Sequence, residues 1–452
     1  MILSACFFLL GWMITVVLTP WVIRVCQRGY GLDDPNETRK TQAVPIPRLG
    51  GAPIVIAALA GLALNFWIDP KATVDWAPIL VGSVLMYGLG FWDDLKPLGA
   101  RKKLLGQILI ASLVWWMGLS IDKVSYPGAR WSVQLYESSY FVTVFWLIAV
   151  PNIINLIDGF DGLASGLGLV LSMTLGIVAI YNEQLEVAYY AFTIAGALMG
   201  FLVYNFPPAR IYLGDGGAYL IGFSIAALSL SSSNKGSVAA VLLVTIVALG
   251  IPILDTTFAL IRRAVRGYPI FHADDEHFHH RLERLGLTKH RALMAFYAIA
   301  VVFSLLGLSI VWSQGRTLPI AIGAVFVLAI VALRYFHQVG TWQDLLRKAR
   351  RTLSRRDQVR YALLQAQVLE LELERCTTSH EFWKVFEITM RRVGFTERGE
   401  AETEVTVSVK HNGSTPWTLY APRNRGSARE WQRLAECFRP VYSRAQAKWQ
   451  TN

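Results

Sequence analysis

Charged residues are scarce in this chain. Only 17% of its 452 residues are Asp, Glu, Lys or Arg, whereas about a quarter of a soluble globular domain is charged. The deficit lies in the first three quarters, where apolar runs of about 20 residues recur, each long enough to cross a hydrocarbon core about 30 Å thick. This scarcity excludes a single soluble globular domain and predicts a polytopic membrane protein.

Cysteine is also scarce, and no internal repeat is visible. Cys6, Cys26, Cys376 and Cys437 are far apart and match no metal-binding spacing, so neither a disulfide framework nor a cysteine-based metal site is expected. The first apolar run, from Ile2 to about Val25, lacks a basic start and a small-residue cleavage site, which predicts a retained span. The lack of a repeat gives an inverted-repeat transporter no support.

Eleven apolar segments predict an all-α transmembrane domain over residues 1–336. Their approximate bounds are 2–24, 50–68, 77–92, 104–121, 139–156, 163–181, 186–204, 217–232, 237–257, 292–312 and 317–336. From about Gly340 the composition becomes that of a soluble region. Residues 340–452 therefore predict a small α+β domain, with helices at 357–376, 381–393 and 428–448 and strands at 404–409 and 417–420.

Basic residues gather in the loops that follow odd-numbered segments. Lys and Arg mark cytoplasmic loops, so the pattern places those loops and the C-terminus in the cytoplasm and the N-terminus outside the inner or plasma membrane. The net charge of +11 is then explained by these flanks and by anionic lipid headgroups. A nucleic-acid partner is not required.

The densest polar stretch at a membrane edge is Asn152–Gly166. Within it Asn152, Asn155, Asp158 and Asp161 recur at every third position, a spacing that brings neighbours together on one side of a helix. Carboxylates at a membrane edge are costly and are functional candidates.

The other polar motifs also follow odd-numbered segments. Asp93 and Asp94 close the third segment, where both can reach one site from a frayed helix end. Asp215 lies in a glycine-rich turn that can offer backbone N–H groups to phosphate and its carboxylate to a metal. This segregation predicts an active site on the cytoplasmic face, whereas a transport path would place polar groups at mid-membrane.

Five carboxylates thus gather at one face, and no cysteine joins them. They are Asp93, Asp94, Asp158, Asp161 and Asp215. Oxygen ligands favour Mg²⁺, with Mn²⁺ as an alternative, and Mg²⁺ needs only one or two carboxylates besides water and phosphate. The remaining carboxylates are expected to abstract protons or to bind substrate.

A histidine-rich loop follows the ninth segment, at 272–282. Clustered histidines can bind zinc, but arginines such as Arg281 repel a dication, and His and Arg donors suit a diphosphate. Phosphate binding is the favoured interpretation. Lys103 and Gln107 lie one helical turn apart and either approach the same site or are an ordinary interfacial pair. An acidic metal site, a diphosphate-binding loop and a membrane location together suggest phosphoryl transfer to a lipid phosphate.

Five motifs in order resemble the polyprenyl-phosphate N-acetylhexosamine-1-phosphate transferases of glycosyltransferase family 4. They are DDPN…RK…PRLGG, FWDD, NIINLIDGFDGLASG, NFPPARIYLGDGG and HADDEHFHHRL, and they cover about residues 1–336. The resemblance implies that a UDP-N-acetylhexosamine and polyprenyl phosphate give a polyprenyl-diphospho-sugar and UMP, with Mg²⁺. It carries nothing over to residues 340–452, and a homodimer is one further expectation.

The resemblance also implies roles for individual residues. Asp215 resembles the principal metal ligand, Asp158 and Asp161 resemble groups near the nucleotide or metal, and Asp93 and Asp94 resemble the lipid-phosphate side, with Asp93 the candidate base. Substrate contacts are implied for Lys40, Arg48, Lys103, Asn155, Asn205, Tyr212, His277, His279 and His280.

Two details favour one branch of this family. Pro47–Gly51 and the interrupted histidines of His277–His280 resemble enzymes that use UDP-N-acetylglucosamine to start surface polysaccharides such as O-antigen, rather than those that use UDP-muramoyl-pentapeptide. Gly216 replaces the family's usual serine. Direct attack by the lipid phosphate is preferred over a covalent aspartyl intermediate. A divalent-cation or phosphorylated-solute transporter and a membrane-anchored scaffold are the rival hypotheses.

Overall fold

The computed structural model divides the chain into two compact units, and the described residues of the first lie within 2–337 and those of the second within 356–450. The structure describes residues 2–29, 31–33, 45–70, 73–125, 132–231, 288–337, 356–397, 400, 404–409, 417–423 and 428–450.

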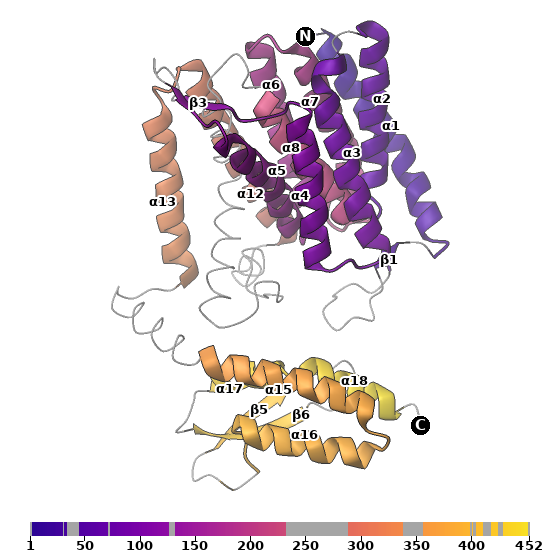
Figure 1. Cartoon of the computed structure of the whole chain (residues 1–452), viewed down its shortest axis with the longest axis vertical. Helices are drawn as coiled ribbons and strands as arrows, with labels where there is room; N and C mark the ends of the chain where they lie inside the picture. The colour runs from indigo at the N-terminus through magenta and orange to yellow at the C-terminus, as the bar shows by residue number, and fades with distance from the viewer. Residues whose placement is uncertain are drawn as a thin grey trace. The chain divides into compact units, whose positions relative to one another are not determined.

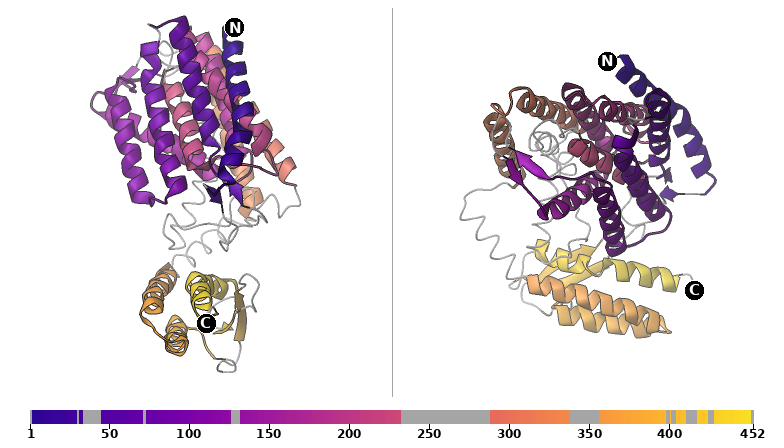
Figure 2. Two further views of the ribbon diagram at one scale, coloured as in Figure 1. Left: turned by 90° about the vertical axis from the view of Figure 1, so that its right-hand side faces the viewer. Right: turned by 45° about the horizontal axis from the view of Figure 1, so that its top comes forward.

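The first unit is a bundle of helices (Figures 1 and 2). They are α1 (Ile2–Cys26), α2 (Gly51–Ile68), α3 (Thr73–Leu95), α4 (Ala100–Trp116), α5 (Ser138–Ile157), α6 (Leu163–Tyr181), α7 (Leu185–Asn205), α8 (Gly214–Ser231), α12 (Lys289–Trp312) and α13 (Leu318–His337). Each corresponds to a predicted segment, and the predicted segment at 237–257 lies outside the described residues. Of the described helices, α1, α2, α5, α6, α7 and α12 are long and apolar enough to cross a membrane. The total of eleven crossings stays a prediction.

Helix α8 runs through the middle of this unit. Its side chains are buried from Gly216 to Ser231, and it packs against α3 and α5. The contact with α3 is close, because a Cβ on Gly90 would lie 2.5 Å from the carbonyl carbon of Asp215. The fold therefore sets the N-terminus of α8, which carries Asp215, directly against the end of α3.

The polar loops of the first unit meet at one end of the bundle. There β1 (Leu32–Asp33) pairs antiparallel with β2 (Ile46–Pro47), whereas β3 (Lys123–Ser125) pairs with β4 (Ser132–Gln134) at the opposite end (Figure 1). The loop after α7 joins the first pair: the N–H of Tyr212 donates to the carbonyl of Pro47 at 2.7 Å, and that of Gly50 donates to the carbonyl of Tyr212 at 3.0 Å. Two polar motifs far apart in sequence are thus one structural element.

The second unit is the predicted α+β domain. Its elements are α15 (Arg356–Arg375), α16 (Ser379–Val393), β5 (Glu404–Val409), β6 (Trp417–Pro422), α17 (Ala428–Glu436) and α18 (Arg439–Gln450). The two strands form the predicted hairpin, with Val407 opposite Leu419. The prediction of one helix over 428–448 is wrong, because the chain breaks at Cys437 and Phe438. Pro440 has no N–H to continue the preceding helix and suits the first turn of α18.

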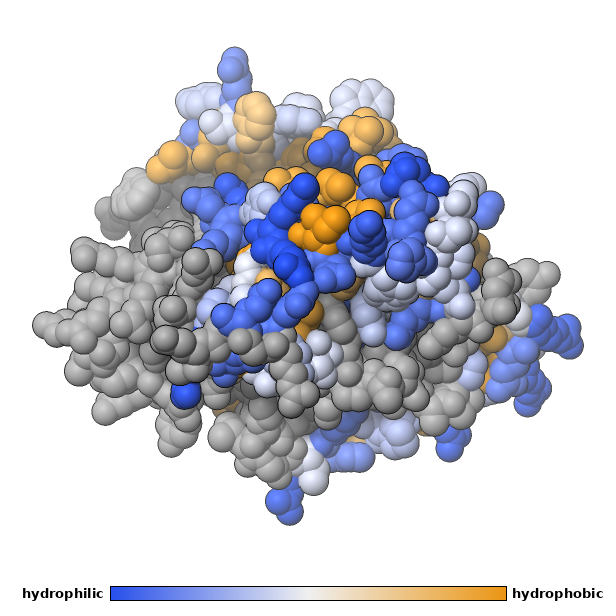
Figure 3. Space-filling model, turned by 90° about the horizontal axis from the view of Figure 1, so that it is seen from below, coloured by the Kyte–Doolittle hydropathy of each residue, from blue (hydrophilic) through white to orange (hydrophobic). Residues whose placement is uncertain are grey.

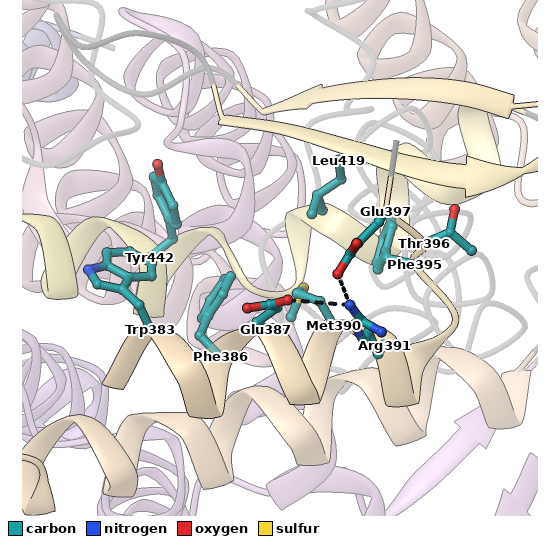
Figure 4. Close-up of a pocket in the computed structure, with 10 residues that line it drawn as sticks. All are labelled: Trp383, Phe386, Glu387, Met390, Arg391, Phe395, Thr396, Glu397, Leu419 and Tyr442. Atoms are coloured by element: carbon teal, nitrogen blue, oxygen red, sulfur yellow. Dashed lines mark ion pairs between the residues drawn. The ribbon is translucent and has the colours of Figure 1, made fainter. Parts of the chain in front are cut away.

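A pocket of about 370 Å³ lies over one face of α16 (Figure 4). Trp383, Phe386, Met390 and Tyr442 are among its apolar lining residues. At one end Arg391 forms ion pairs with Glu397 and, at 3.5 Å, with Glu387. In the space-filling view of Figure 3, hydrophilic residues surround a hydrophobic patch near the centre, and further hydrophobic residues lie along the upper edge.

Candidate active site

Lys103 joins the ends of three helices. Its ammonium lies 2.6 Å from Oδ2 of Asp93, in the last turn of α3, and 2.7 Å from Oδ2 of Asp215, in the first turn of α8. Lys103 itself belongs to the first turn of α4, and its backbone N–H donates to the carbonyl of Gly99 at 3.2 Å. One ammonium therefore bridges two of the five predicted carboxylates.

The second oxygen of Asp215 is held from a fourth helix. The Nδ2 group of Asn155, on the last turn of α5, donates to Oδ1 of Asp215 at 2.9 Å. Both oxygens of Asp215 are thus oriented by donors from α4 and α5. Such fixed orientation is what a catalytic or metal-binding carboxylate needs.

Asp94 caps helix α8. Its two carboxylate oxygens accept hydrogen bonds from the backbone N–H groups of Asp215 and Gly216, each at 2.9 Å. In this structure a carboxylate satisfies these two N–H groups, the first donors of the helix, and suits its positive end. That this turn binds phosphate stays a prediction. Gly214 makes this turn possible, since its φ is +74° and a Cβ there would collide with the carbonyl of Arg48.

A pair of amides lies one helical turn behind Lys103 and Asn155. The Nδ2 group of Asn152 donates to Oε1 of Gln107 at 2.8 Å, and the Nε2 group of Gln107 lies 3.5 Å from Oδ1 of Asn152. Gln107 is only 1% exposed. The pair joins α4 to α5 one turn away from the bonds that Lys103 and Asn155 make to Asp215. A direct role of Gln107 in the site stays a prediction.

Asp158 and Asp161 lie in the turn between α5 and α6. Helix α5 ends at Ile157, so the helical interpretation of the three-residue spacing does not extend to Asp161. Oδ2 of Asp161 accepts from the N–H of Ala209 at 3.2 Å. Among the described residues, none donates a hydrogen bond to the Asp158 carboxylate, which feels the charge of Asp215.

Among the described residues of the site, carboxylates outnumber the basic side chains of Lys103 and Arg48. Burial, followed by the charges of Asp215 and Asp94, raises the pKa of Asp158 well above its usual range. Burial likewise raises the pKa of Asp94 to about 7, although two backbone N–H groups oppose that rise. The pKa of Lys103 is raised despite its burial, because Asp215 and Asp93 favour the ammonium. One lysine does not compensate this set of carboxylates.

Asn205 is a positioning residue in this structure. It is 3% exposed, its Oδ1 accepts from the N–H of Gly162 at 3.1 Å and from the hydroxyl of Ser165 at 2.7 Å, and its Nδ2 donates to the carbonyl of Ile211 at 2.9 Å. These bonds tie the Asp158–Gly162 turn to the loop before α8. The contact of Asn205 with a nucleoside stays a prediction, as does that of Tyr212.

Several predicted residues cannot be placed. Lys40, His277, His279 and His280 lie outside the described residues. Arg48 is described, and its charge opposes the rise in the pKa of Asp94. The structure therefore brings together Asp93, Asp94, Lys103, Asn155, Asp158 and Asp215.

The donor set fits a hard cation, although no complete metal cage is built. Within the described part of the chain, no three His, Cys, Asp or Glu side chains are arranged to hold a metal ion on their own. Mg²⁺ does not require such a cage, because it keeps waters and takes substrate phosphate as ligands. The half-buried Asp158 carboxylate, with like charges around it and no donor from the described residues, is an oxygen ligand of the right kind.

Sequence reasoning missed two contributors. Gly90 allows α3 to reach the backbone of Asp215. Two glycines, Gly88 and Gly90, shortly before the Asp93–Asp94 pair were the sequence feature that could have indicated this close approach. Tyr297 of α12 donates its hydroxyl to the carbonyl of Gly162 at 2.5 Å. No local pattern marks that tyrosine, because its partner lies in a distant part of the chain.

Comparisons with known proteins identify the family of this chain. The family described as "Glycosyl transferase family 4" matches residues 76–233. The chain is 34% identical over 324 residues to the probable undecaprenyl-phosphate N-acetylglucosaminyl 1-phosphate transferase of Bacillus subtilis, covering 72% of this chain and 88% of that protein. It is 30% identical over 324 residues to the phospho-N-acetylmuramoyl-pentapeptide-transferase of Geobacillus kaustophilus, covering 67% of this chain and 96% of the relative. The decaprenyl-phosphate N-acetylglucosaminephosphotransferase of Mycobacterium tuberculosis is 31% identical over 263 residues, covering 53% of this chain and 65% of that protein.

Proposed function

This chain belongs to glycosyl transferase family 4, and from that premise we propose that it transfers N-acetylglucosamine-1-phosphate from UDP-N-acetylglucosamine to undecaprenyl phosphate. The products are a polyprenyl-diphospho-sugar and UMP. The names of the relatives from Bacillus subtilis and Mycobacterium tuberculosis support the sugar and the class of lipid acceptor. Such a reaction is the first membrane step of a cell-envelope polysaccharide pathway.

The observation that carries this proposal is the way Asp215 is held. Lys103 and Asn155 each bind one of its oxygens, and Asp94 fixes the helix that bears it. In phosphoryl transfer the protein contributes mainly positioning and charge stabilisation, so a pre-oriented carboxylate beside an ammonium is the expected machinery. The site lies at the end of apolar helices, where a lipid phosphate and a water-soluble nucleotide can both arrive.

A divalent cation completes the proposed site. Asp215, Asp158 and Asp161 would hold Mg²⁺ or Mn²⁺, since they supply oxygen ligands and their charge is not compensated by Lys103 alone. When bound, the ion would neutralise the charge of the diphosphate.

The chemical step needs no covalent enzyme intermediate. A phosphate oxygen of the lipid attacks the phosphorus that bears the sugar, forming a new P–O bond while the bond to the UMP oxygen breaks. The proposed role of Lys103 is to balance charge on these phosphates, and its ammonium beside Asp93 and Asp215 supports that role. For Asp93 to act as a base, Lys103 would have to release the Oδ2 atom of Asp93. A phosphate oxyanion can attack without a base.

The proposed orientation places the site and the C-terminus in the cytoplasm of a bacterial cell. It rests on the basic residues in the loops after odd-numbered segments. The nucleotide sugar would then be taken from the cytoplasm and the lipid product left in the plasma membrane.

The transporter hypothesis is less well supported. The relatives named above are transferases, and the site carboxylates lie at helix ends rather than in the middle of the described spans. A path for ions would need ionisable groups at mid-membrane.

A reconstituted assay tests the proposal. Purified protein with Mg²⁺, radiolabelled UDP-N-acetylglucosamine and undecaprenyl phosphate should give a labelled lipid and UMP, and EDTA should stop the reaction. UDP-N-acetylgalactosamine serves as a donor control. Folded protein that forms no labelled lipid from either donor would refute the transferase function, and turnover that survives EDTA would refute the metal.

A further inference from the structure

Helix α15 of the C-terminal unit is apolar on two faces. Its buried face, in the core of that unit, consists of Ala362, Ala366, Leu369 and Leu373. Its exposed face, here named the α15 stripe, consists of Tyr361, Leu364, Val368 and Leu371, whose exposed fractions are 42%, 60%, 49% and 68%. Helix α15 uses only its buried face to pack in its own domain. The α15 stripe packs against none of the described residues.

The exposed apolar side chains of this unit are concentrated on that stripe. Among the side chains of this unit whose exposure the structure describes, Ile388 on α16 is the only other large apolar one that is exposed. Single exposed apolar residues are ordinary, whereas a contiguous set marks an interaction surface. The stripe is therefore a candidate contact for another protein surface.

The spacing of the stripe identifies the kind of partner. Its members are separated by three, four and three residues, which is the spacing of the seam between two coiled-coil helices. The matching surface is another helix with the same spacing. Helix α15 is itself such a helix, so a second copy of the chain fits the stripe.

The charges beside the stripe select one orientation of that second copy. In an antiparallel pair, Leu364 lies against Val368 of the second copy, and Arg360 on the flank lies against Glu374 of the second copy. Neither Arg360 nor Glu374 forms an ion pair with any other residue in the described part of the chain. The proposed contact gives each of them a partner of opposite charge.

The ends of the seam agree with this orientation. Asp357 and Arg375 occupy the next seam positions beyond the stripe. A parallel pair would place Asp357 against Asp357 of the second copy and Arg375 against Arg375 of the second copy. An antiparallel pair places Asp357 of each chain against Arg375 of the other. Arg375 also forms ion pairs with Glu372 at 2.6 Å and with Glu381 at 3.2 Å. The Arg360–Glu374 pair is therefore stronger evidence for the antiparallel orientation.

The distribution of charge along α15 points the same way. Its C-terminal half carries Glu370, Glu372 and Glu374, although the C-terminal end of a helix favours cations. An antiparallel neighbour brings its own positive N-terminal end beside these carboxylates. Glu370 already pairs with Arg444, and Glu372 pairs with Arg375 at 2.6 Å. A parallel neighbour would therefore add its own Glu374 beside a Glu374 that has no ion pair within the described part of the chain.

We propose that the α15 stripe joins two copies of this chain as an antiparallel helix pair, with the two-fold axis midway between Leu364 and Val368. The contact is small, but both chains would be anchored in one membrane, which raises their effective concentration. This inference does not depend on the proposed transferase reaction.

Cysteine cross-linking of the full-length chain in membranes tests the contact. In a background with exposed Cys6 replaced by Ser, Gln367→Cys places the two introduced thiols beside each other across the two-fold axis. A short bis-maleimide should convert most of this variant to a covalent dimer, and the Cys6→Ser background without Gln367→Cys should stay monomeric on the gel. Folded protein with no dimer from Gln367→Cys would overturn the proposal.

A second set of variants tests the orientation. Leu371→Cys alone should give no dimer, because the two copies of that position lie about 15 Å apart along the helix axis in an antiparallel pair. Co-expressed Tyr361→Cys and Leu371→Cys chains should cross-link. A dimer from Leu371→Cys alone would show a parallel pair and overturn the antiparallel assignment.

A charge in the stripe provides the final test. Leu364→Glu added to the Gln367→Cys chain should lower cross-linking at least tenfold, while Ile388→Glu, an equal change at an exposed apolar position outside the stripe, should leave it unchanged. Equal effects of the two substitutions would contradict the proposal. So would quenching of a fluorophore at position 371 by lipid-borne quencher, which would place the stripe against the bilayer.

Discussion

Asp215 illustrates how much of the candidate site depends on single side chains. One of its oxygens accepts from Lys103 and the other from Asn155, so replacement by Asn removes a charge and one of two acceptors. We expect Asp215→Asn to lower kcat by at least about 100-fold, the scale for loss of a pre-oriented polar group in an active site. Turnover in the labelled-lipid assay measures this. Unchanged thermal melting and membrane insertion are the required controls, and substantial residual turnover would refute a metal role for Asp215.

Gln107 acts one turn away from that contact. Gln107→Leu leaves the amide of Asn152 without its side-chain partner, at a cost of about 1–3 kcal/mol for a buried polar group. We expect a lower kcat with little change in KM, because Lys103 and Asn155 lose their mutual alignment.

The double variant Gln107→Leu with Asn152→Leu separates alignment from polarity. Removing both partners eliminates the unsatisfied amide, so stability should recover while kcat stays low. Full recovery of kcat as well would show that the pair matters only for stability.

Cys437 gives the C-terminal unit a dependence on alkaline pH. Burial is the main reason that the pKa of its thiol rises from 9.0 to about 12. The folded unit therefore holds this proton where the unfolded chain has lost it, and stability falls as pH rises from 9 towards 12. Denaturant unfolding at several pH values should show a steeper decline for the native chain than for Cys437→Ala. Parallel declines would contradict the assignment.

At the scale of elements, the approach of α3 to α8 determines where Asp215 lies. A Cβ on Gly90 would meet the backbone of Asp215 and Gly216 at 2.5 Å, and backbone atoms cannot move aside as a side chain can. We expect Gly90→Ala to lower both turnover and the melting temperature.

Gly88→Ala is the matched control for that prediction. Gly88 lies on the same helix, and a Cβ there would meet nothing within 4 Å. Its replacement by Ala should leave turnover unchanged and stabilise the helix slightly, by up to about 1 kcal/mol. Equal losses in both variants would show that helix composition, not the close approach, is the cause.

The sequence predicted the bounds of helices that are apolar along their whole length. The predicted segment at 163–181 coincides with α6, because apolar residues continue up to a glycine turn at one end and Asn182 at the other. The end of α5 was not predictable from spacing, since Asp158 terminates the helix instead of continuing its polar side. The site was predictable as a set of carboxylates at one face, but not as a set of contacts. That Asp94 caps α8 depends on the packing of α3 against α8, which no local pattern encodes.

For the whole molecule, the first unit brings the ionisable groups of the candidate site, Asp93, Asp94, Lys103, Asp158 and Asp215, together at one end of an apolar bundle. Burying such groups in hydrocarbon is costly, and gathering them at one end confines that cost to a region that water and nucleotides reach. The basic loops predicted from sequence alone which end of the bundle holds the site. Which contacts each carboxylate makes could be learned only from the structure. The C-terminal unit contains no family motif, so the proposed dimer contact rests on the exposure, spacing and charge of α15.

The ammonium of Lys103 determines how strongly metal binding should affect the stability of the folded protein. A ligand that binds only the folded state raises its stability in proportion to its affinity. Because Lys103 already supplies a positive charge to Asp93 and Asp215, folding does not have to wait for the ion. EDTA should therefore abolish transfer while changing the melting temperature little. In Lys103→Met the same carboxylates lack that charge, and the melting temperature should rise with added Mg²⁺. A native chain whose melting temperature collapses in EDTA would show instead that its fold depends on the metal.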